Sequence, residues 1–589
     1  MLGVLLQSLV GIPHQPVRPP VVFEHLGVDD ADNPDRDLHM VRATVGIAVD
    51  DFGPFVYRGP RWHRADIGQR LQNRLRRRVD DNLSRCFYGH YYQVSNAAAF
   101  ADQVERLTLG CVQQLSWTDD MMLRAERPAT PLQIQMLLIY DPSTAPGGKV
   151  TFKGILDELD ARLHLADVFR RRLTELPGGF HRPYWVDDPS FDLEYHVRHI
   201  GLPQPGDWRQ LCIQVARLHA RQIDLRRPPW EITVIEGLNA VPGVPRGSFA
   251  MALKLHHCAV DGMASVAMIA AMHDLAADSP RPAGPDSPWR PAPLPTAANL
   301  LSRMAINAAL HPLRVGAVLA SSTPKAVRGL AGLPGKLVSG VVSRVAEGSG
   351  PLFPPKTRFN QSVSPHRVFE ARFHDLADFK RIKASVPGST VNDVALAYVG
   401  GALREYLDGH GELPDESLVA ACPMSLRETG DQTSRGNALF GRLQSLGTDI
   451  ADPLERLASI AASTAGSRSG SDKSTGAQLL DLIGTVPTSL LGATARAASV
   501  LPFSGPTVAN TTVTNVPGPT EPIFFSGARL VRAAGLGPLI GGLNLIHVVA
   551  SYNGTLSISA TADRDALPDP ATYAECMEHA FKGLLVGAS

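Results

Sequence analysis

The sequence predicts an α/β protein built from two layered halves. Apolar runs of strand length alternate with segments whose apolar residues recur at helical spacing, and this alternation occurs on both sides of a proline-rich stretch. The 589 residues are enough for two to four domains at about 150 residues each. Apolar residues make up 44% of the chain and charged residues 19%, a balance typical of globular rather than disordered proteins.

The first half reads as a folded domain from Leu115 onward. Its expected strands cover 132–141, 230–238 and 248–257, and its expected helices cover 152–173 and 262–277. The stretch after residue 278 is rich in proline and predicts an extended linker that leads into small amphipathic helices.

The second half repeats the alternation. Residues 391–407 predict a helix, with Ser389, Thr390 and Asn392 as candidate caps. Strands are expected at 507–519, 543–554 and 555–565, the last two joined by a tight turn at Asn553-Gly554. We therefore divide the chain into four parts, which are an extension of unknown role at 1–110, an N-terminal domain at 111–285, a linker at 286–355 and a C-terminal domain at 356–589.

Charge and composition exclude several classes of function. Lys and Arg together number 57, as do Asp and Glu, so the chain has no overall basic field for nucleic acid. A basic run at 69–82 is interpreted as a solvated helix face. The six cysteines form no CxxC pair, which favours a reducing cytosol, and no apolar stretch reaches the ~18 residues of a transmembrane helix. The N-terminus lacks the features of a secretory signal.

The segment 255–262 carries the most informative pattern, HHxxxDG. On a strand of period two, Phe249, Met251, Leu253, Leu255 and His257 share an apolar face that ends at an imidazole. A neutral imidazole with a pKa near ~6.5 suits proton abstraction around neutral pH. Asp261 is placed to cap the following helix, and Gly262 allows a tight turn.

Each of these residues also has a plainer interpretation. A histidine at a strand end is most often a satisfied core residue, and an aspartate before a helix is most often only a cap. The pair His256-His257 lacks a third ligand cluster, so we expect no metal site.

The pattern as a whole resembles a broad superfamily of CoA-dependent acyltransferases and condensation domains. Further blocks resemble the bacterial wax ester synthase/acyl-CoA:diacylglycerol acyltransferases over about four fifths of the chain. These blocks are LSWTDDMMLRAE at 115–126, the segments 181–206, 223–238 and 389–407, PMSLR followed by RGNALF, NVPGP at 515–519, and 543–570.

The resemblance implies a fold of two chloramphenicol-acetyltransferase-like domains, each a mixed sheet with flanking helices, that face each other across a central tunnel. It implies transfer of a long-chain fatty acyl group from acyl-CoA to diacylglycerol, giving triacylglycerol, or to a long-chain alcohol, giving a wax ester. Acyl-CoA is then a co-substrate, and no metal or other cofactor is expected. The enzyme would work in the cytoplasm, at the inner membrane face or on lipid droplets.

The resemblance also assigns roles to residues. His257 is the general base, His256 shapes the site, and Asp261 with Gly262 orients the turn. Asn392 is a candidate for stabilising the oxyanion, with a plain helix cap as the alternative. The motif residues expected to bind substrate or to support the site are Trp230, Asp393, Asn515, Pro517 and Gly518.

Two residues stand out against the family pattern. Pro229 replaces the leucine of the Pro-Leu-Trp block, which removes a backbone donor and leaves acceptor positioning open. Cys258 follows His257 directly, and we expect it to be a small buried residue rather than a nucleophile.

The CoA phosphates predict an Arg or Lys cluster at the tunnel mouth beside His257.

Two alternative functions stay open at this point. One is a condensation-type acyltransferase with a carrier-bound or polyketide substrate. The other is a catalytically weak protein that binds lipid droplets.

Overall fold

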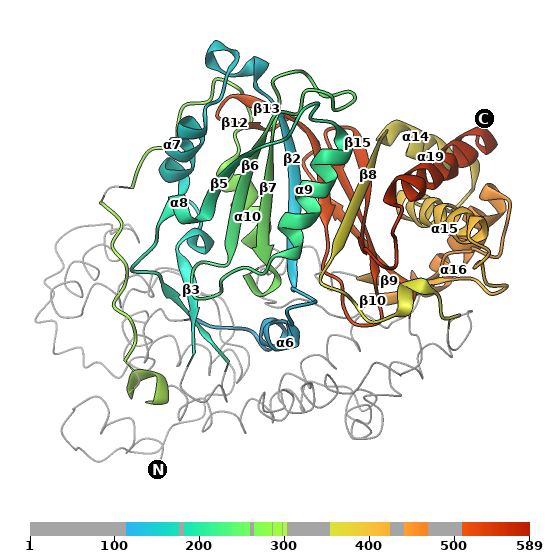
Figure 1. The fold of residues 1–589 in the computed structure, drawn as a ribbon, viewed down its shortest axis with the longest axis horizontal. Helices are drawn as coiled ribbons and strands as arrows, with labels where there is room; N and C mark the ends of the chain where they lie inside the picture. Colours follow the sequence, from blue (N-terminus) through green and yellow to red (C-terminus); the bar gives the residue numbers. More distant parts are fainter. Residues whose placement is uncertain are drawn as a thin grey trace, which may run out of the picture. The chain divides into compact units, whose positions relative to one another are not determined.

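The computed structural model describes residues 113–175, 182–259, 264–285, 287–296, 298–302, 354–423, 441–468 and 509–589 (Figure 1). The predicted extension at 1–110 and its basic run lie outside these ranges. So does most of the predicted linker.

The first large sheet of the described residues has the order β12-β13-β2-β7-β6-β5. Its strands are β2 (Gln133–Asp141), β5 (Val197–Gly201), β6 (Trp230–Glu236), β7 (Phe249–His256), β12 (Phe524–Phe525) and β13 (Ala528–Leu536). The strands predicted at 132–141, 230–238 and 248–257 are confirmed.

Two strands of this sheet come from the C-terminal part of the chain. β13 pairs antiparallel with β2, so that Ala533 lies opposite Leu138 and Leu536 opposite Gln135. The two predicted halves therefore share a sheet. Strands β12 and β13, which follow the predicted linker at 286–355, join the sheet formed by strands that precede it.

The second large sheet has the order β10-β9-β11-β14-β15-β8 within the described residues. Its strands are β8 (Arg367–Asp375), β9 (Val419–Pro423), β10 (Gly441–Ser445), β11 (Thr511–Pro517), β14 (Leu545–Tyr552) and β15 (Thr555–Asp563). Asn553 and Gly554 both have positive φ and join β14 to β15, which confirms the predicted tight turn.

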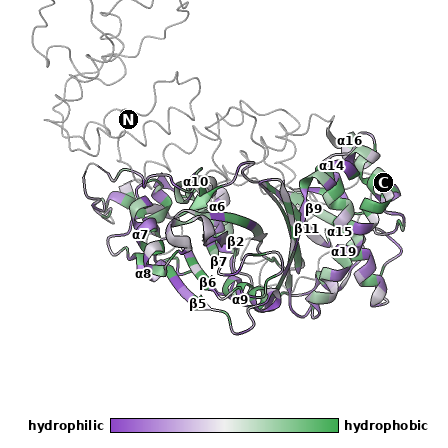
Figure 2. Ribbon diagram, turned by 90° about the horizontal axis from the view of Figure 1, so that it is seen from above, coloured by the Kyte–Doolittle hydropathy of each residue, from purple (hydrophilic) through white to green (hydrophobic). Residues whose placement is uncertain are grey.

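Helices cover the sheets in layers. One face of the second sheet packs against α14 (Leu376–Ser385), α15 (Val391–Gly409), α16 (Pro453–Arg468) and α19 (Pro570–Gly587). In Figure 2 the helices show both hydrophobic and hydrophilic segments, as expected for helices that bury one face. Among the helices of the described residues, none has the length and apolar character to cross a bilayer.

The first sheet is buried on both faces. Leu138 and Met251 pack with α7 (Phe152–Arg162) and α10 (Ala264–Met272). On the opposite face, Leu137 and Ala252 pack with α9 (Trp208–Ala220) and with β8 of the second sheet. Side chains alternate between these two cores because successive residues of a strand point to opposite faces.

Close contacts tie β13 to the second sheet. A Cβ built on Gly535 would lie 2.6 Å from a methyl group of Val548, and one on Gly537 would lie 2.4 Å from a methyl group of Ile546. A larger residue at Gly535 would force Val548 to move, so glycine favours the close approach of β13 to β14. The Ser559 hydroxyl donates a hydrogen bond of 2.6 Å to the Gly535 carbonyl, so this carbonyl has a partner from the second sheet.

The helix predicted at 152–173 is wrong in its second part. α7 ends at Arg162, and the chain then forms β3 (Arg171–Thr174), which pairs with β4 (Tyr184–Asp187) beside β1 (Gln113–Gln114). Pairing with a strand distant in sequence overrides the local helical pattern.

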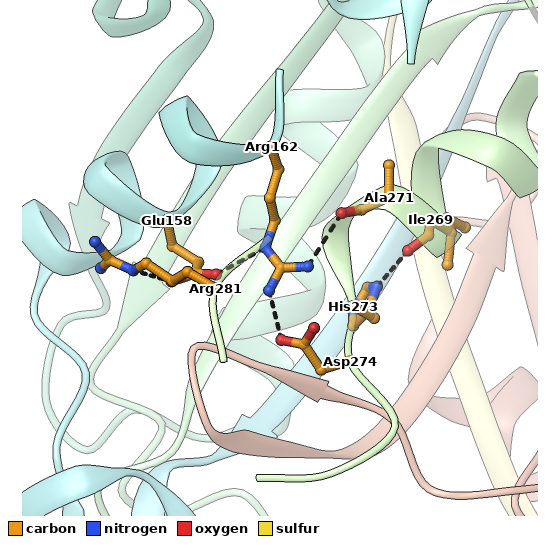
Figure 3. A network of polar contacts seen from close by, with 7 residues as sticks. All are labelled: Glu158, Arg162, Ile269, Ala271, His273, Asp274 and Arg281. Carbon is orange, nitrogen blue, oxygen red and sulfur yellow. Dashed lines mark hydrogen bonds and ion pairs between the residues drawn. The ribbon is translucent and has the colours of Figure 1, made fainter. Parts of the chain in front are cut away.

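A buried ion network fixes the end of α10, the helix that follows the HHxxxDG motif (Figure 3). The Arg162 guanidinium donates hydrogen bonds to Glu158 at 2.7 Å, to the Ala271 carbonyl at 3.2 Å and to Asp274 at 2.5 Å. Arg281 pairs with the second Glu158 oxygen at 2.9 Å. Arg162 thereby fastens α7 to the C-terminal end of α10.

Replacing Arg162 by Met should destabilise the fold by about 3–5 kcal/mol, because two carboxylates would lose a buried cation. Arg281→Met is the matched control, since the Arg281 side chain is 57% exposed and should contribute under about 1 kcal/mol. Denaturant unfolding followed by circular dichroism measures both. Equal effects of the two substitutions would contradict the central place of Arg162.

Candidate active site

The HHxxxDG motif begins at the end of β7. β7 stops at His256, and His257 opens a short 3₁₀ turn, η5 (His257–Ala259). The backbone N–H of His256 donates 3.0 Å to the Pro229 carbonyl, and that of His257 donates 2.9 Å to the Leu132 carbonyl. His257 therefore leaves the strand while its backbone stays fastened to β2. Asp261 and Gly262 lie outside the described residues.

The predicted apolar face of β7 is confirmed. Phe249, Met251, Leu253 and Leu255 all belong to the core shared with α7 and α10. Lys254 points to the opposite side, where its ammonium donates to the carbonyls of Leu218 and Arg221 at the end of α9. The strand that presents His257 is thus held on both faces.

The surrounding protein keeps the His257 imidazole in its neutral form. Its side chain keeps partial access to solvent, but the surrounding protein lowers its pKa to about 4. Burial is the main cause, because it disfavours the charged form, and the neighbouring His256 adds to the effect. His257 is therefore neutral at neutral pH.

His256 and Cys258, the two chain neighbours of His257, contact each other. His256 is fully buried, its Nδ1 lies 2.8 Å from the Cys258 sulfur and accepts the Cys258 backbone N–H at 3.2 Å. Burial raises the pKa of the Cys258 thiol well above its usual value, and the carboxylates Asp119 and Glu126 act in the same direction. Cys258 is only 2% exposed, as we expected. Its thiol stays protonated, and a protonated, buried thiol is a poor nucleophile.

Trp230 supports the site from inside the core. Its indole is fully buried, donates 3.0 Å to the Phe169 carbonyl and stacks on His196 at 4.5 Å between ring centroids. Trp230 lies opposite Leu255 in the β6–β7 pairing. Its contacts therefore place β6 against the histidine-bearing strand.

Pro229 lies next to Trp230 and opposite His256. Its carbonyl accepts the His256 N–H, but its ring has no N–H to return to the His256 carbonyl. The proline therefore removes one ladder hydrogen bond beside the motif and leaves the strand pairing in place.

The pair Asn392-Asp393 lies in the first turn of α15, which packs on the second sheet. Thr390 is the N-cap, and Asp393 completes a capping box with it, accepting its N–H at 2.8 Å and its hydroxyl at 2.7 Å. Asp393 also accepts the Thr464 hydroxyl at 2.9 Å, which joins α15 to α16. The alternative that Asn392 is a helix cap is wrong, because the helix begins one residue before it.

Asn392 meets Asn515 instead. The Asn515 amide donates to the Asn392 side-chain oxygen at 3.4 Å. Directly after β11, a Cβ on Gly518 would lie 2.2 Å from the Ser551 carbonyl oxygen, so only glycine fits there. The predicted motif residues at the second sheet are thus brought together, while His257 lies in the turn that follows β7 of the first sheet.

A cavity of about 390 Å³ opens beside the two asparagines. It is lined by Asn392, Leu396, Cys422, Pro423, Arg442, Gln444, Thr464, Val513, Asn515 and Pro517. The buried Gln444 side-chain oxygen has no hydrogen-bond partner in the structure. The cavity therefore offers a cation, amide groups and an unsatisfied acceptor beside an apolar wall.

Three carboxylates of the described residues act on the histidine turn. Asp119, Asp120 and Glu126 all act on the Cys258 thiol, and Asp120 pairs with Arg124 at 2.9 Å. The basic cluster at a tunnel mouth stays a prediction. In the described ranges, no group of three or more His, Cys, Asp and Glu side chains is arranged to hold a metal ion.

Comparison with family models accounts for most of the chain. Residues 115–395 match the wax ester synthase/diacylglycerol acyltransferase catalytic domain, and residues 435–585 match the WS/DGAT C-terminal domain. The chain belongs to the WS/DGAT family.

Curated members of the WS/DGAT family match at similar levels. A putative diacylglycerol O-acyltransferase of Mycobacterium tuberculosis is 31% identical over 479 residues, which cover 80% of this chain and 90% of the relative. One of Mycobacterium bovis is 32% identical over 483 residues, which cover 80% of this chain and 99% of the relative.

Solved structures share the fold. The wax ester synthase/diacylglycerol acyltransferase from Marinobacter aquaeolei VT8 gives a TM-score of 0.56 at 24% identity, covering 81% of this chain and 99% of that one. Trichothecene 15-O-acetyltransferase from Fusarium sporotrichioides gives 0.50 at 12% identity, covering 80% and 95%. The expected fold class of two sheet-rich α/β halves is confirmed.

Glu126 lies beside the histidine turn and was not singled out in the sequence. It ends the block LSWTDDMMLRAE, and its carboxylate lies 3.5 Å from His256 Nε2. Only its membership in that block could have drawn attention to it, because it precedes the motif by a long stretch of chain.

The two neighbours at the start of α15 should respond differently to alanine. Asp393→Ala should cost about 2–3 kcal/mol of stability, because the Thr390 N–H and hydroxyl lose their acceptor and the link between α15 and Thr464 of α16 is lost. Asn392→Ala should stay within about 0.5 kcal/mol of wild type, because its side chain lines the cavity. Thermal unfolding of both variants checks this, and an equal loss for Asn392→Ala would contradict the assignment.

Proposed function

We propose that the protein transfers a long-chain fatty acyl group from acyl-CoA to diacylglycerol and forms triacylglycerol, with long-chain alcohols as a second acceptor class. The observation that carries this proposal is the neutral, enclosed imidazole of His257 in the HHxxxDG motif of a WS/DGAT family member. The names of the mycobacterial relatives support diacylglycerol as the acceptor.

The proposed reaction needs one base and no acyl-enzyme intermediate. The neutral His257 takes the proton of the acceptor hydroxyl as the oxygen attacks the thioester carbonyl. The tetrahedral intermediate then collapses, the C–S bond breaks, and the imidazolium returns the proton to the CoA thiolate. The products are the ester and free CoA. The enclosed Cys258 with its raised pKa supports direct transfer rather than an acyl-enzyme.

The other motif residues are proposed to support this step. Asp261 and Gly262 would orient the turn, and Asn392 would donate to the developing oxyanion. A positioned base contributes typically ~10²–10⁴-fold, and one oxyanion donor about 3 kcal/mol. Holding both lipids beside the imidazole supplies the remainder.

His257→Ala should abolish CoA release from a long-chain acyl-CoA with dioleoylglycerol, because the hydroxyl proton would have no acceptor. CoA release is followed with a thiol reagent, and circular dichroism confirms that the variant is folded. A fully active variant would exclude His257 as the base. In a parallel arm, release from acyl-carrier protein but not from acyl-CoA would instead support a condensation-type enzyme.

The pH profile tests the same assignment. Because the pKa of His257 is lowered to about 4, protonation of this group removes activity only as the pH falls toward that value. In the wild type, kcat/KM should therefore show no acidic limb with a midpoint near 6.5. Such a limb in protein that stays folded would contradict the assignment.

We infer that the enzyme meets its acceptor at a cytoplasmic lipid surface, either the inner membrane face or lipid droplets. Among the exposed large apolar side chains of the described residues, Leu275 (80% exposed), Leu294 and Leu301 lie within the same stretch of sequence, which supports apolar contact with a lipid surface. Apolar contact of this kind is little affected by salt.

Flotation with vesicles of neutral phosphatidylcholine should therefore recover the protein equally at low and high NaCl. Loss of binding at high salt would indicate electrostatic attachment. Absence of binding at both would exclude this surface.

A further inference from the structure

The end of α6 (Trp117–Ala125) brings a carboxylate to the back of the histidine turn. Glu126 follows this helix, and its side chain is only 10% exposed. One oxygen, Oε1, accepts the Leu132 backbone N–H at 3.2 Å and lies 3.5 Å from Nε2 of His256. The same carboxylate oxygen thus serves both the start of β2 and the first histidine of the motif.

The contacts of His256 determine where its ring carries a proton. Nδ1 accepts the Cys258 backbone N–H, and the Cys258 thiol stays protonated beside it. In the neutral ring the proton must therefore lie on Nε2, the nitrogen that faces Glu126. Nε2 of the fully buried His256 has no hydrogen-bond partner in the structure, and Glu126 Oε1, 3.5 Å away, is the acceptor nearby. Leaving a buried Nε2–H unpaired is costly, so a small approach of the two side chains would stabilise the site.

Two routes lead from Glu126 to His257. Through His256, the Cys258 N–H is held and the 3₁₀ turn that begins at His257 is fixed. Through Leu132, whose N–H binds Glu126 and whose carbonyl accepts the His257 N–H at 2.9 Å, the backbone of the base is fixed directly.

We propose that Glu126 is a positioning residue that holds His256 as its Nε2–H tautomer and thereby orients the turn that presents His257. Its effect on the reaction rests on the proposed function of His257 as the base. The two other carboxylates near the turn are engaged elsewhere, since Asp119 accepts the Ser116 hydroxyl and Asp120 pairs with Arg124.

The kinetic test compares three variants. Glu126→Met removes the acceptor and should lower kcat about 10- to 100-fold, the range for a displaced reacting group, with KM for both substrates unchanged. Glu126→Gln keeps an oxygen acceptor and should retain most of the activity. The matched control is Glu405→Met, which removes the exposed carboxylate 2.7 Å from His579, far along the chain in α15, and should leave kcat unchanged.

A merely structural role would give a different result. Equal losses for Glu126→Met and Glu126→Gln that follow the fall in melting temperature would overturn the proposal, and so would full activity of Glu126→Met. If Glu126→Met does not fold, Glu126→Asp takes its place, because the shorter side chain withdraws the acceptor.

A second readout does not depend on catalysis. In protein with ¹⁵N-labelled histidine, the His256 signals, assigned by their loss in His256→Gln, should show the Nε2–H tautomer in the wild type and in Glu126→Gln. An Nδ1–H tautomer in the wild type would overturn the proposal even if the protein released no CoA. Absence of CoA release with the expected tautomer would count against the proposed function alone.

Discussion

The pairing of β13 with β2 is the constraint on which the described structure depends. β2 holds the histidine-bearing strand β7 on one side and needs a partner on the other, because an unpaired strand edge leaves backbone groups unsatisfied. That partner arrives from the C-terminal part of the chain, and Gly535 and Gly537 let it approach β14 of the second sheet. The sheet that presents the motif is therefore completed only when both halves have folded together.

From this sheet follows the character of the site. Since β7 is buried on both faces, its last residue, His256, is enclosed, and His257 lies where the chain turns out of the strand. The same burial lowers the pKa of His257 and keeps the imidazole neutral at neutral pH. Arg162 holds the far end of the next helix, α10, so the motif lies between two anchored elements. Anchoring of this kind limits the reorganisation that a reaction must otherwise provide.

The sequence alone predicted the parts that depend on local pattern. Period two in β7 and the Asn553-Gly554 turn were readable because each is determined by neighbouring residues. β13 was not predicted as a strand, since its alanines and glycine have low strand propensity and its partner lies far away in sequence. Glu126 was also missed, because it is far from the HHxxxDG motif in the sequence and only the fold brings it close to His256. Asn392 was misread as a possible cap because helix ends shift by one or two residues between pattern and structure.

The central claim is that the hydroxyl of the acceptor reaches the imidazole of His257. A structure of the wild-type protein with a thioether analogue of acyl-CoA and with diacylglycerol would test it most directly. If His257 is the base, the free hydroxyl lies at about 2.6–3.2 Å from a nitrogen of His257, beside the carbonyl of the acyl chain. A hydroxyl bound against another side chain, with His257 in contact with neither substrate, would contradict it.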